Sequence, residues 1–338
     1  MHFTGYSTRL AAYAVLVDDR EQILLTWFNG GSRRAGAGWS LPGGGVDFDE
    51  GIRAGLVREV HEETGYAVRV GELLAEHHFT GPAHERDGRP FRSQRLVFAA
   101  EIVGGELGTT EVGGTTDFAR WVPLADLAAE PLVDIVRLGV RAWQGRAHAE
   151  RHRLHAGRLT QVVGGVSDWD APTPVAEWTA RDVVGHLVGW LPGFLAAGCD
   201  VVLETGPSVA QDPVGAWAHH RDQVQALLED PDLAHRTYRH DRVPDAPLGE
   251  VVDRFYTTDV FLHTWDLARA SGQDDTLDPP TVAQLYDGLR AAEEVIRASG
   301  QFGKAQPVPD DAGLQDRLVA LIGRDPGWRP PGRGPSTG

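Results

Sequence analysis

Three glutamates in the first half of the chain have the spacing of a metal-binding helix face. Glu59, Glu62 and Glu63 are three and four residues apart along the chain, so their side chains would be neighbours on a helix. At about 100° per residue, Glu63 projects almost onto the apolar stripe of that helix. A carboxylate turned toward a core is costly unless its charge is compensated. The pattern therefore predicts a bound cation, and oxygen ligands of this kind suit Mg²⁺ or Mn²⁺.

The segment before this helix has the composition of a ligand-binding loop. Gly43 and Gly44 lie in a turn where glycines allow the backbone to pass close to a ligand. Glu50 favours the positive N-terminal end of the helix, and Arg58 is placed to pair with Glu50 across the loop. Gly65 is a natural residue to end the helix. The competing interpretation is an acidic, solvated helix face, which leaves Arg58 and the inward-facing glutamate unexplained.

These residues resemble the Nudix box, G-x5-E-x7-R-E-U-x-E-E-x-G-U, in which U is a bulky apolar residue. Its fixed positions fall on Gly44, Glu50, Arg58, Glu59, Val60, Glu62, Glu63, Gly65 and Tyr66. Tyr66 is the one departure, an aromatic residue where an aliphatic one is usual. The resemblance implies a Mg²⁺-dependent hydrolase that cleaves a diphosphate bond in a nucleoside diphosphate linked to another group, X.

In that interpretation the three glutamates hold the metal and Arg58 orients them. A carboxylate would also assist deprotonation of the attacking water. The sequence leaves this base open between Glu62 and a later acid, for which Glu101, Glu111 and Asp117 are the candidates. The substrate also stays open, because specificity in this family depends on loops outside the box.

A second set of possible metal ligands lies in the other half of the chain. Asp259 and His263 are four residues apart, so they share a helix face, and His186 lies on the apolar side of an earlier helix. Two imidazoles and a carboxylate suit Zn²⁺, Ni²⁺ or Fe²⁺ with a position left for water. The alternative is a core in which both histidines are neutral and Asp259 pairs with an arginine such as Arg254.

The segments that carry these residues, HTWDLA from His263 and WTARDVVGH ending at His186, resemble the mycothiol-dependent maleylpyruvate isomerase N-terminal family. Members of that family are metal-binding, DinB-like four-helix bundles with a His on the second helix and Glu-x3-His on the fourth. The resemblance implies Zn²⁺ or another divalent transition metal on His186, Asp259 and His263, with Asp in place of the usual Glu. It also implies alternative functions: a mycothiol-dependent isomerase or transferase, or a metabolite-binding bundle without catalysis.

The elements that hold these residues predict an α/β plus all-α protein. A Nudix α/β/α sandwich would span residues 1–145, and a DinB-like four-helix bundle residues 150–328. Residues 146–158 would form a linker and the start of the first bundle helix, and residues 329–338 a disordered tail.

The apolar patterns place the individual elements. In the first half, residues 13–17 and 22–27 have the pattern of a hairpin, and the other expected strands and helix are at 67–78, 92–102, 118–122 and 131–144. In the second half we expect helices and no strands. Thr179 and Asp182 have the spacing of a capping box. The remaining helices are expected at 154–166, 213–229, 248–271, 280–299 and 310–323.

His148, His152 and His155 follow at helical spacings in the basic segment 145–158. They could ligate a metal, but four nearby arginines would repel a cation, so we favour a solvated helix face. Cys199, the single cysteine, excludes an intrachain disulfide and is expected to be an inert buried thiol.

The composition is that of an acidic globular protein, with 41% hydrophobic residues and a net charge of −16. That charge disfavours a nucleic-acid or anionic-membrane surface, because such binding depends on Lys and Arg. No apolar run approaches the length of a membrane span. We therefore expect a cytoplasmic protein with a small-molecule, nucleotide-type substrate, and we leave a homodimer open.

Overall fold

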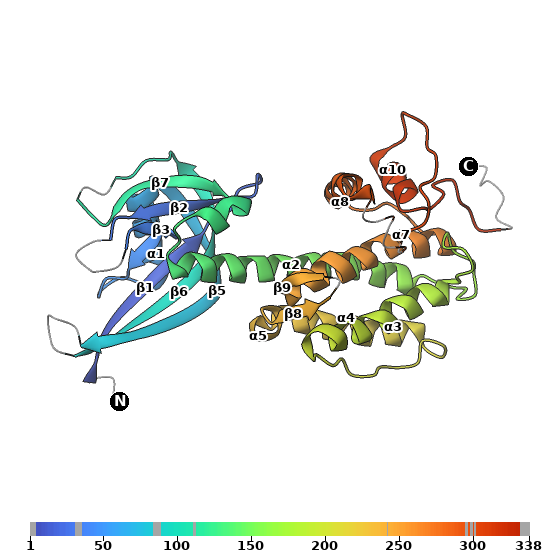
Figure 1. The fold of residues 1–338 in the computed structure, drawn as a ribbon, viewed down its shortest axis with the longest axis horizontal. Coiled ribbons are helices and arrows are strands. Elements are labelled where there is room, and N and C mark those ends of the chain that lie inside the picture. Colours follow the sequence, from blue (N-terminus) through green and yellow to red (C-terminus); the bar gives the residue numbers. More distant parts are fainter. Residues whose placement is uncertain are drawn as a thin grey trace. The chain divides into compact units, whose positions relative to one another are not determined.

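The computed structural model describes residues 5–30, 36–83, 89–110, 113–241, 243–294, 297, 300 and 302–331. The chain forms two compact units, Met1–Arg146 and Ala147–Gly338. The first contains the two larger sheets and the second is mainly helical (Figure 1).

The first unit contains two sheets. One has the strand order β4-β1-β6-β5 and the other β3-β2-β7. The strands are β1 (Ser7–Val15), β2 (Gln22–Phe28), β3 (Gly38–Ser40), β4 (Gly43–Gly45), β5 (Tyr66–Ala83), β6 (Pro90–Gly105) and β7 (Thr116–Pro123). In the first sheet β1 runs parallel to β6 and antiparallel to β4.

Helices cover opposite faces of these sheets because alternate strand residues point to opposite sides. On one side, Leu56 and Val60 of α1 (Ile52–Thr64) pack in a core with Ala12 and Leu24. On the other side, Ile135 of α2 (Asp134–Gly164) and its neighbours pack in a second core with Val15 and Leu25. The expected α/β/α sandwich is therefore confirmed.

The expected hairpin of residues 13–17 and 22–27 is only partly correct. Both runs are strands, but β1 and β2 belong to different sheets and are joined only by a bridge between Val17 and Ile23. Both edges of β1 are occupied by β4 and β6, so no edge remains for β2. The Asp18 carboxylate orders the turn by accepting from the backbone N–H of Gln22 at 2.8 Å.

Residues 146–158, expected as a linker and the start of the first bundle helix, lie inside the continuous helix α2, which has 31 residues. This stretch contains no proline, and its alanines, arginines and leucine favour a helix, so nothing in it ends the helix begun at Asp134. Of the expected tail, residues 332–338 lie outside the described residues.

The second unit is built mainly from helices: α3 (Ala180–Cys199), α4 (Pro213–Glu229), α5 (Pro231–Ala234), α6 (Leu248–Val251), η3 (Val252–Thr257), α7 (Thr258–Ser271), α8 (Pro279–Ala291) and α10 (Leu314–Leu321). Helix α3 packs against both α4 and α7, and α8 packs against α10. The capping box is confirmed, since Thr179 and Asp182 bond reciprocally at the start of α3.

The expected helix 248–271 is present with an irregularity. Its middle, η3, is a π-helical segment between α6 and α7. Such segments are rare and occur often at functional sites. This one directly precedes Asp259, one of the expected metal ligands.

Two expectations about the second half are wrong. A two-stranded sheet, β8 (Thr237–His240) paired with β9 (Val243–Pro247), lies between the helices, so strands do not vanish there. Helix α3 is also long and apolar enough to cross a membrane by length and composition, although no such run was expected. Its buried side chains belong to the core of the bundle.

The basic, histidine-rich segment is not a solvated face either. His152 and His155 are 0% and 3% exposed, because this side of α2 packs into the bundle. His152 Nδ1 lies 3.2 Å from Thr257 Oγ1, and His148 Nδ1 lies 3.0 Å from an Asp253 carboxylate oxygen. The arginine charge that suggested solvation is carried on neighbouring positions of the same helix.

Candidate active site and candidate metal centre

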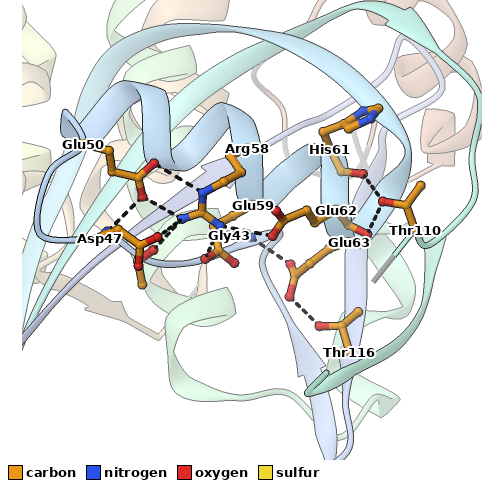
Figure 2. Close-up of polar contacts among 11 residues, drawn as sticks. Gly43, Asp47, Glu50, Arg58, Glu59, His61, Glu62, Glu63, Thr110 and Thr116 are labelled. Atoms are coloured by element: carbon orange, nitrogen blue, oxygen red, sulfur yellow. Dashed lines mark hydrogen bonds and ion pairs between the residues drawn. The ribbon is translucent and has the colours of Figure 1, made fainter. Parts of the chain in front are cut away.

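Arg58 joins the acidic residues of the first unit (Figure 2). Its Nη2 donates to Glu50 at 2.6 Å, which confirms the expected pair, and also to the Gly45 carbonyl oxygen at 3.2 Å. Its Nη1 donates to Glu59 at 3.0 Å and to Glu62 at 3.1 Å. One guanidinium thus compensates three carboxylates, and its hydrogen bond holds the pKa of Glu50 below its ordinary value.

Glu63 lies apart from this network and is 7% exposed, as its position on the apolar stripe predicted. One carboxylate oxygen accepts from the backbone N–H of Gly43 at 2.9 Å, and the other accepts from the Thr116 hydroxyl. A buried carboxylate with two donors is fixed in place. Thr116 could not be found from the sequence, because β7 is remote from the box along the chain.

Other groups approach the backbone of the loop glycines so closely that a side chain there would collide with them. A Cβ on Gly44 would collide with the Glu59 carboxylate, and one on Gly43, where φ is +130°, would collide with the Ala12 carbonyl oxygen. Gly65 ends α1 as expected, in the left-handed conformation and with its N–H bonded to His61.

Among the described residues, the ligand atoms of the three box glutamates are not gathered as closely as those of the second unit. Within the described ranges, they are not among the groups whose ligand atoms lie together, because Arg58 stands between Glu59 and Glu62. Of the candidate later acids, Glu101 pairs with Arg69 at 2.9 Å and Asp117 accepts from Asn29 at 2.9 Å. Glu111 lies outside the described residues.

The second unit does bring its three expected ligands together. One ligand atom from each of His186, Asp259 and His263 lies within 4.8 Å of the others. His186 Nε2 is 2.9 Å and His263 Nε2 is 3.4 Å from the Asp259 carboxylate, which also accepts from Trp190 Nε1 at 2.9 Å. We call His186, Asp259 and His263 the triad.

The proposed pairing of Asp259 with Arg254 is not found. Arg254 instead lies over the ring of Phe255 at 5.3 Å, within the range of a cation–π contact. Asp259 is engaged by imidazole and indole nitrogens rather than by a guanidinium.

Behind the triad lies a carboxylate that the sequence interpretation missed. Asp266 is 0% exposed and accepts from His263 Nδ1 at 2.9 Å, which leaves His263 Nε2 facing Asp259. Arg324 donates to Asp266 through Nη2 at 3.0 Å and through Nε at 3.1 Å. Metal-binding histidines commonly have such a carboxylate on the other ring nitrogen. The His-x-x-Asp spacing at 263 and 266 could have indicated it.

The triad attracts positive charge. Burial lowers the pKa of His263, but Asp259 and Asp266 outweigh it and the net shift is upward. Burial raises the pKa of Asp259, but the two histidines and Trp190 outweigh it and the net shift is downward. Two carboxylates beside one imidazole are the chemistry of a cation site.

An open cleft of about 510 Å³ lies beside the triad and is lined by Ala176, Glu177, Trp178, Asp182, Gly185 and His186. The Trp178 ring stacks on His263, with centroids 5.5 Å apart, and lies 5.0 Å from the ring of His186. Trp178 therefore forms the wall of the cleft that packs against His186 and His263. The cleft gives a small molecule access to His186.

Comparisons with known proteins divide the chain in the same way. A family described as "NUDIX domain" matches residues 7–143, and one described as "Mycothiol maleylpyruvate isomerase N-terminal domain" matches residues 152–268. An uncharacterized protein of Mycobacterium tuberculosis is 32% identical over 161 residues, which are 45% of this chain and 83% of that protein.

Two curated relatives are hydrolases of nucleotides by name. A putative 8-oxo-dGTP diphosphatase of Bacillus subtilis is 30% identical over 33% of this chain and 64% of its own length. A CMP-5'-(N-acetyl-N-hydroxy-3-aminopropyl)phosphonate hydrolase of Streptomyces rubellomurinus is 37% identical over 36% of this chain and 54% of its own length. Among solved structures, a MutT Nudix hydrolase from Burkholderia pseudomallei is 28% identical, with a TM-score of 0.32, over 39% of this chain and 95% of its own.

Proposed function

The chain belongs to the Nudix family through its first unit and to the mycothiol maleylpyruvate isomerase N-terminal family through its second, and we propose that it hydrolyses nucleoside diphosphates linked to X. The reaction would use Mg²⁺ or Mn²⁺. The observation that carries the proposal is the arrangement of Glu50, Glu59 and Glu62 on Arg58, with Glu63 fixed beside the glycine turn.

The donor set fits a hard divalent cation. Carboxylate oxygens are the ligands that Mg²⁺ prefers, and Glu59 and Glu62 are 20% and 42% exposed at the side chain, within reach of solvent. When bound, the metal would neutralise phosphate oxygens and acidify a water molecule. Glu59, Glu62 and Glu63 would hold it, while Arg58 keeps the first two oriented through its hydrogen bonds.

The remaining groups have separate tasks in this proposal. Glu62 is our candidate for the base that accepts the proton of the attacking water, because it is more exposed than Glu59 and Glu63. The Gly43 and Gly44 backbone lets the diphosphate approach the acids without a Cβ in the way.

The test is hydrolysis by the full chain of a panel of nucleotide sugars, ADP-ribose and nucleoside triphosphates, with Mg²⁺, with Mn²⁺ and with EDTA. We expect metal-dependent release of a nucleoside monophosphate from at least one compound, followed by phosphorus NMR. A matched control is Glu101→Gln, which removes a carboxylate of the same domain that pairs with Arg69. No release from any compound with either metal would contradict the proposal.

A second function is favoured by the triad. We infer that His186, Asp259 and His263 hold Zn²⁺ or another divalent transition metal, because their ligand atoms lie within 4.8 Å and Asp266 orients His263. A thiol-dependent isomerase or transferase would then use the cleft beside His186. Metal analysis of the full chain, purified without chelator, tests the first step. Less than about a tenth of an equivalent, with no uptake on titration, would exclude the site.

A further inference from the structure

The first sheet carries a row of polar and aromatic side chains beside the glycine turn. Across β1, β6 and β5, Arg9 is paired in register with Ser93, and Ser93 with Phe79. In the next row Arg95 is paired with His77. Residues paired side by side in a sheet project to the same face. We call Arg9, His77, Phe79, Ser93 and Arg95 the shelf.

Contacts join the Phe79 end of the shelf, where Phe79 is exposed and Arg95 and Ser93 are buried. The Arg95 guanidinium lies over the Phe79 ring at 4.8 Å and contacts His77 Nδ1 at 2.9 Å. Helix α2 reaches this face beside Phe79: its first residue, Asp134, bonds to Arg95, and a Cβ on its Gly139 would meet Leu41, Val15 and Val97. Phe79 itself remains 42% exposed.

Phe79 has the properties of a stacking platform. Arg95, which backs its ring, is 5% exposed and is held by two hydrogen bonds to Asp134, of 2.9 and 2.8 Å. Burial lowers the pKa of His77, as does the charge of Arg95, and His77 Nδ1 lies 2.9 Å from the Arg95 Nη2 donor. The Nε of Arg95 is buried without a hydrogen-bond partner among the described residues. A ring fixed in this way loses little entropy when a planar group stacks on it.

Arg9 lies at the other end of the shelf, where the proposed diphosphate site begins. Its Nε and Nη2 would be 3.7 Å from a Cβ placed on Gly45, and the Gly45 carbonyl accepts from Arg58. Within the described residues Arg9 is exposed and makes no ion pair. A guanidinium beside a glycine turn is suited to a phosphate oxygen.

The distance along the shelf fits one nucleotide. Arg9 and Phe79 are separated by two strand spacings, about 10 Å in a sheet of ordinary geometry. That length places a phosphate at Arg9 and an aromatic base at Phe79, with the ribose passing between them over the buried Ser93. The sites along the shelf therefore follow the same order as the phosphate, ribose and base of a nucleoside phosphate.

We propose that the shelf binds the nucleoside half of the substrate, with Phe79 stacking on the base and Arg9 binding the phosphate attached to the ribose. The inference rests on the proposed diphosphate hydrolysis and makes it more specific. The leaving group would be the part of the substrate beyond the second phosphate, which the shelf does not contact. Specificity for nucleosides over other diphosphates would come from Phe79.

Binding of products tests the shelf without requiring turnover. Calorimetric titration of the full chain with AMP, CMP, GMP and UMP, and with ribose 5-phosphate, separates the base from the phosphate. For Phe79→Ala we expect about a tenfold or larger loss of affinity for the nucleotide that binds wild type most tightly. Ribose 5-phosphate should bind this variant and wild type equally. Arg9→Gln should weaken both kinds of ligand.

Two further variants make the result specific. Phe118→Ala removes an aromatic ring of similar exposure, 48%, on the other sheet, and should leave nucleotide affinity unchanged. Phe79→Tyr retains a ring and should retain affinity, which excludes a folding defect as the cause of the loss in Phe79→Ala. Circular dichroism of each variant gives an independent check of folding.

The outcomes separate this inference from the proposed hydrolysis. Equal nucleotide affinity for Phe79→Ala and wild type would overturn the shelf, and so would an equal loss of ribose 5-phosphate binding. Nucleotide binding that depends on Phe79 without hydrolysis of any diphosphate would uphold the shelf and refute the hydrolase. Hydrolysis that proceeds with an unchanged KM in Phe79→Ala would uphold the hydrolase and refute the shelf.

Discussion

The two acidic sites of this chain compensate their carboxylates in different ways. In the first unit Arg58 stands between Glu59 and Glu62, so the acids are neutralised by a side chain of the protein. In the second, Asp259 is contacted by two imidazoles whose ligand atoms already lie within 4.8 Å of each other. The first arrangement suits a metal that arrives with its substrate, and the second a metal that stays.

The surroundings of the two sites strengthen this contrast. Glu62 is 42% exposed at its side chain, whereas the His263 side chain is 6% exposed. Water screens charges at the first site, so its metal affinity should be modest without phosphate. At the second, Asp266 and Arg324 fix the ligand from behind, so less ordering is needed on binding. Metal exchange should therefore be fast in the first unit and slow in the second.

The largest effect should come from Glu63→Gln, which would break the first site alone. The glutamine oxygen can still accept from the Gly43 N–H, and its NH₂ group can donate to the Thr116 hydroxyl oxygen. The fold should therefore survive. The lost ligand charge should lower kcat by about a hundredfold or more, equivalent to about 2.7 kcal/mol of transition-state stabilisation. The measurement is Mg²⁺-dependent turnover of the best substrate in the panel.

The transition-metal content proposed for the second unit would serve as the internal control for this variant. If the sites are independent, Glu63→Gln should retain wild-type transition-metal content. Turnover equal to wild type would refute the role of Glu63. Loss of both turnover and transition-metal content would show that the substitution disturbs folding.

The complementary change, His263→Ala, should empty the triad and leave hydrolysis intact. A metal present at a thousand times its Kd stabilises the native state by about 4 kcal/mol, and this contribution should disappear. Thermal unfolding with and without added Zn²⁺ measures it. A control is His61→Ala, which removes an exposed imidazole on α1. If His263→Ala destabilises the protein equally with and without metal, the histidine is a core residue and not a ligand.

The buried histidines of the second unit predict a pH dependence that the acids of the first unit do not share. Burial lowers the pKa values of His152, His155 and His220 to about 4. In an unfolded chain they would be near 6.5, so below that pH the unfolded state binds protons that the folded state refuses. Above pH 6.5 these histidines do not lower the free energy of unfolding. As the pH drops toward 4, that free energy falls by up to about 3 kcal/mol per histidine.

Hydrogen exchange resolves this effect for each unit, once intrinsic rates at each pH are taken into account. Amides in α4 should lose protection between pH 7 and pH 5. In His220→Phe that loss should be smaller by roughly one histidine's share, because one titrating group is gone. Identical protection at both pH values would show that these histidines are protonated without opening the bundle.

The histidines also show where sequence patterns mislead. His148, His152 and His155 stand among arginines, which indicated a solvated face, yet two of the three are buried. Local charge did not reveal that Arg151 and His148 both contact Asp253 of the bundle, so an arginine of this segment also faces the core. The change of texture located the boundary between the units, at Arg146 and Ala147, but not its conformation, because the polar, basic segment continues the helix.

The two sites were predictable to different depths. The box supplied Arg58, its pairing with Glu50 and the burial of Glu63, because those contacts lie within one helix and the loop before it. The triad required a contact between α3 and α7, and only the family resemblance brought these helices together. Thr116 and Arg324 reach their sites from remote segments, and no local pattern encodes such contacts.

The most subtle test concerns Asp266, which touches no substrate or metal and acts through His263. Asp266→Asn keeps the shape of the side chain but removes the charge that holds the His263 ring and Arg324. Loss of such a partner typically weakens metal binding by about 10- to 100-fold. We expect a Zn²⁺ affinity lower by that factor in competition with a chelator of known Kd, with hydrolysis unchanged.

A purely structural role for Asp266 would give a different result, and a second variant separates the two. Burial raises the pKa of Asp266, but His263 and Arg324 outweigh it, so the carboxylate is ionised and its loss also leaves Arg324 unpaired. Arg324→Gln removes that ion pair while keeping the Asp266–His263 bond. If Asp266 positions His263, Asp266→Asn should lower Zn²⁺ affinity more than Arg324→Gln does, at comparable melting temperatures without metal. Equal Zn²⁺ affinities in the two variants would assign Asp266 to packing alone. As a control, Asp287→Asn at an exposed position should change neither the Zn²⁺ affinity nor the melting temperature.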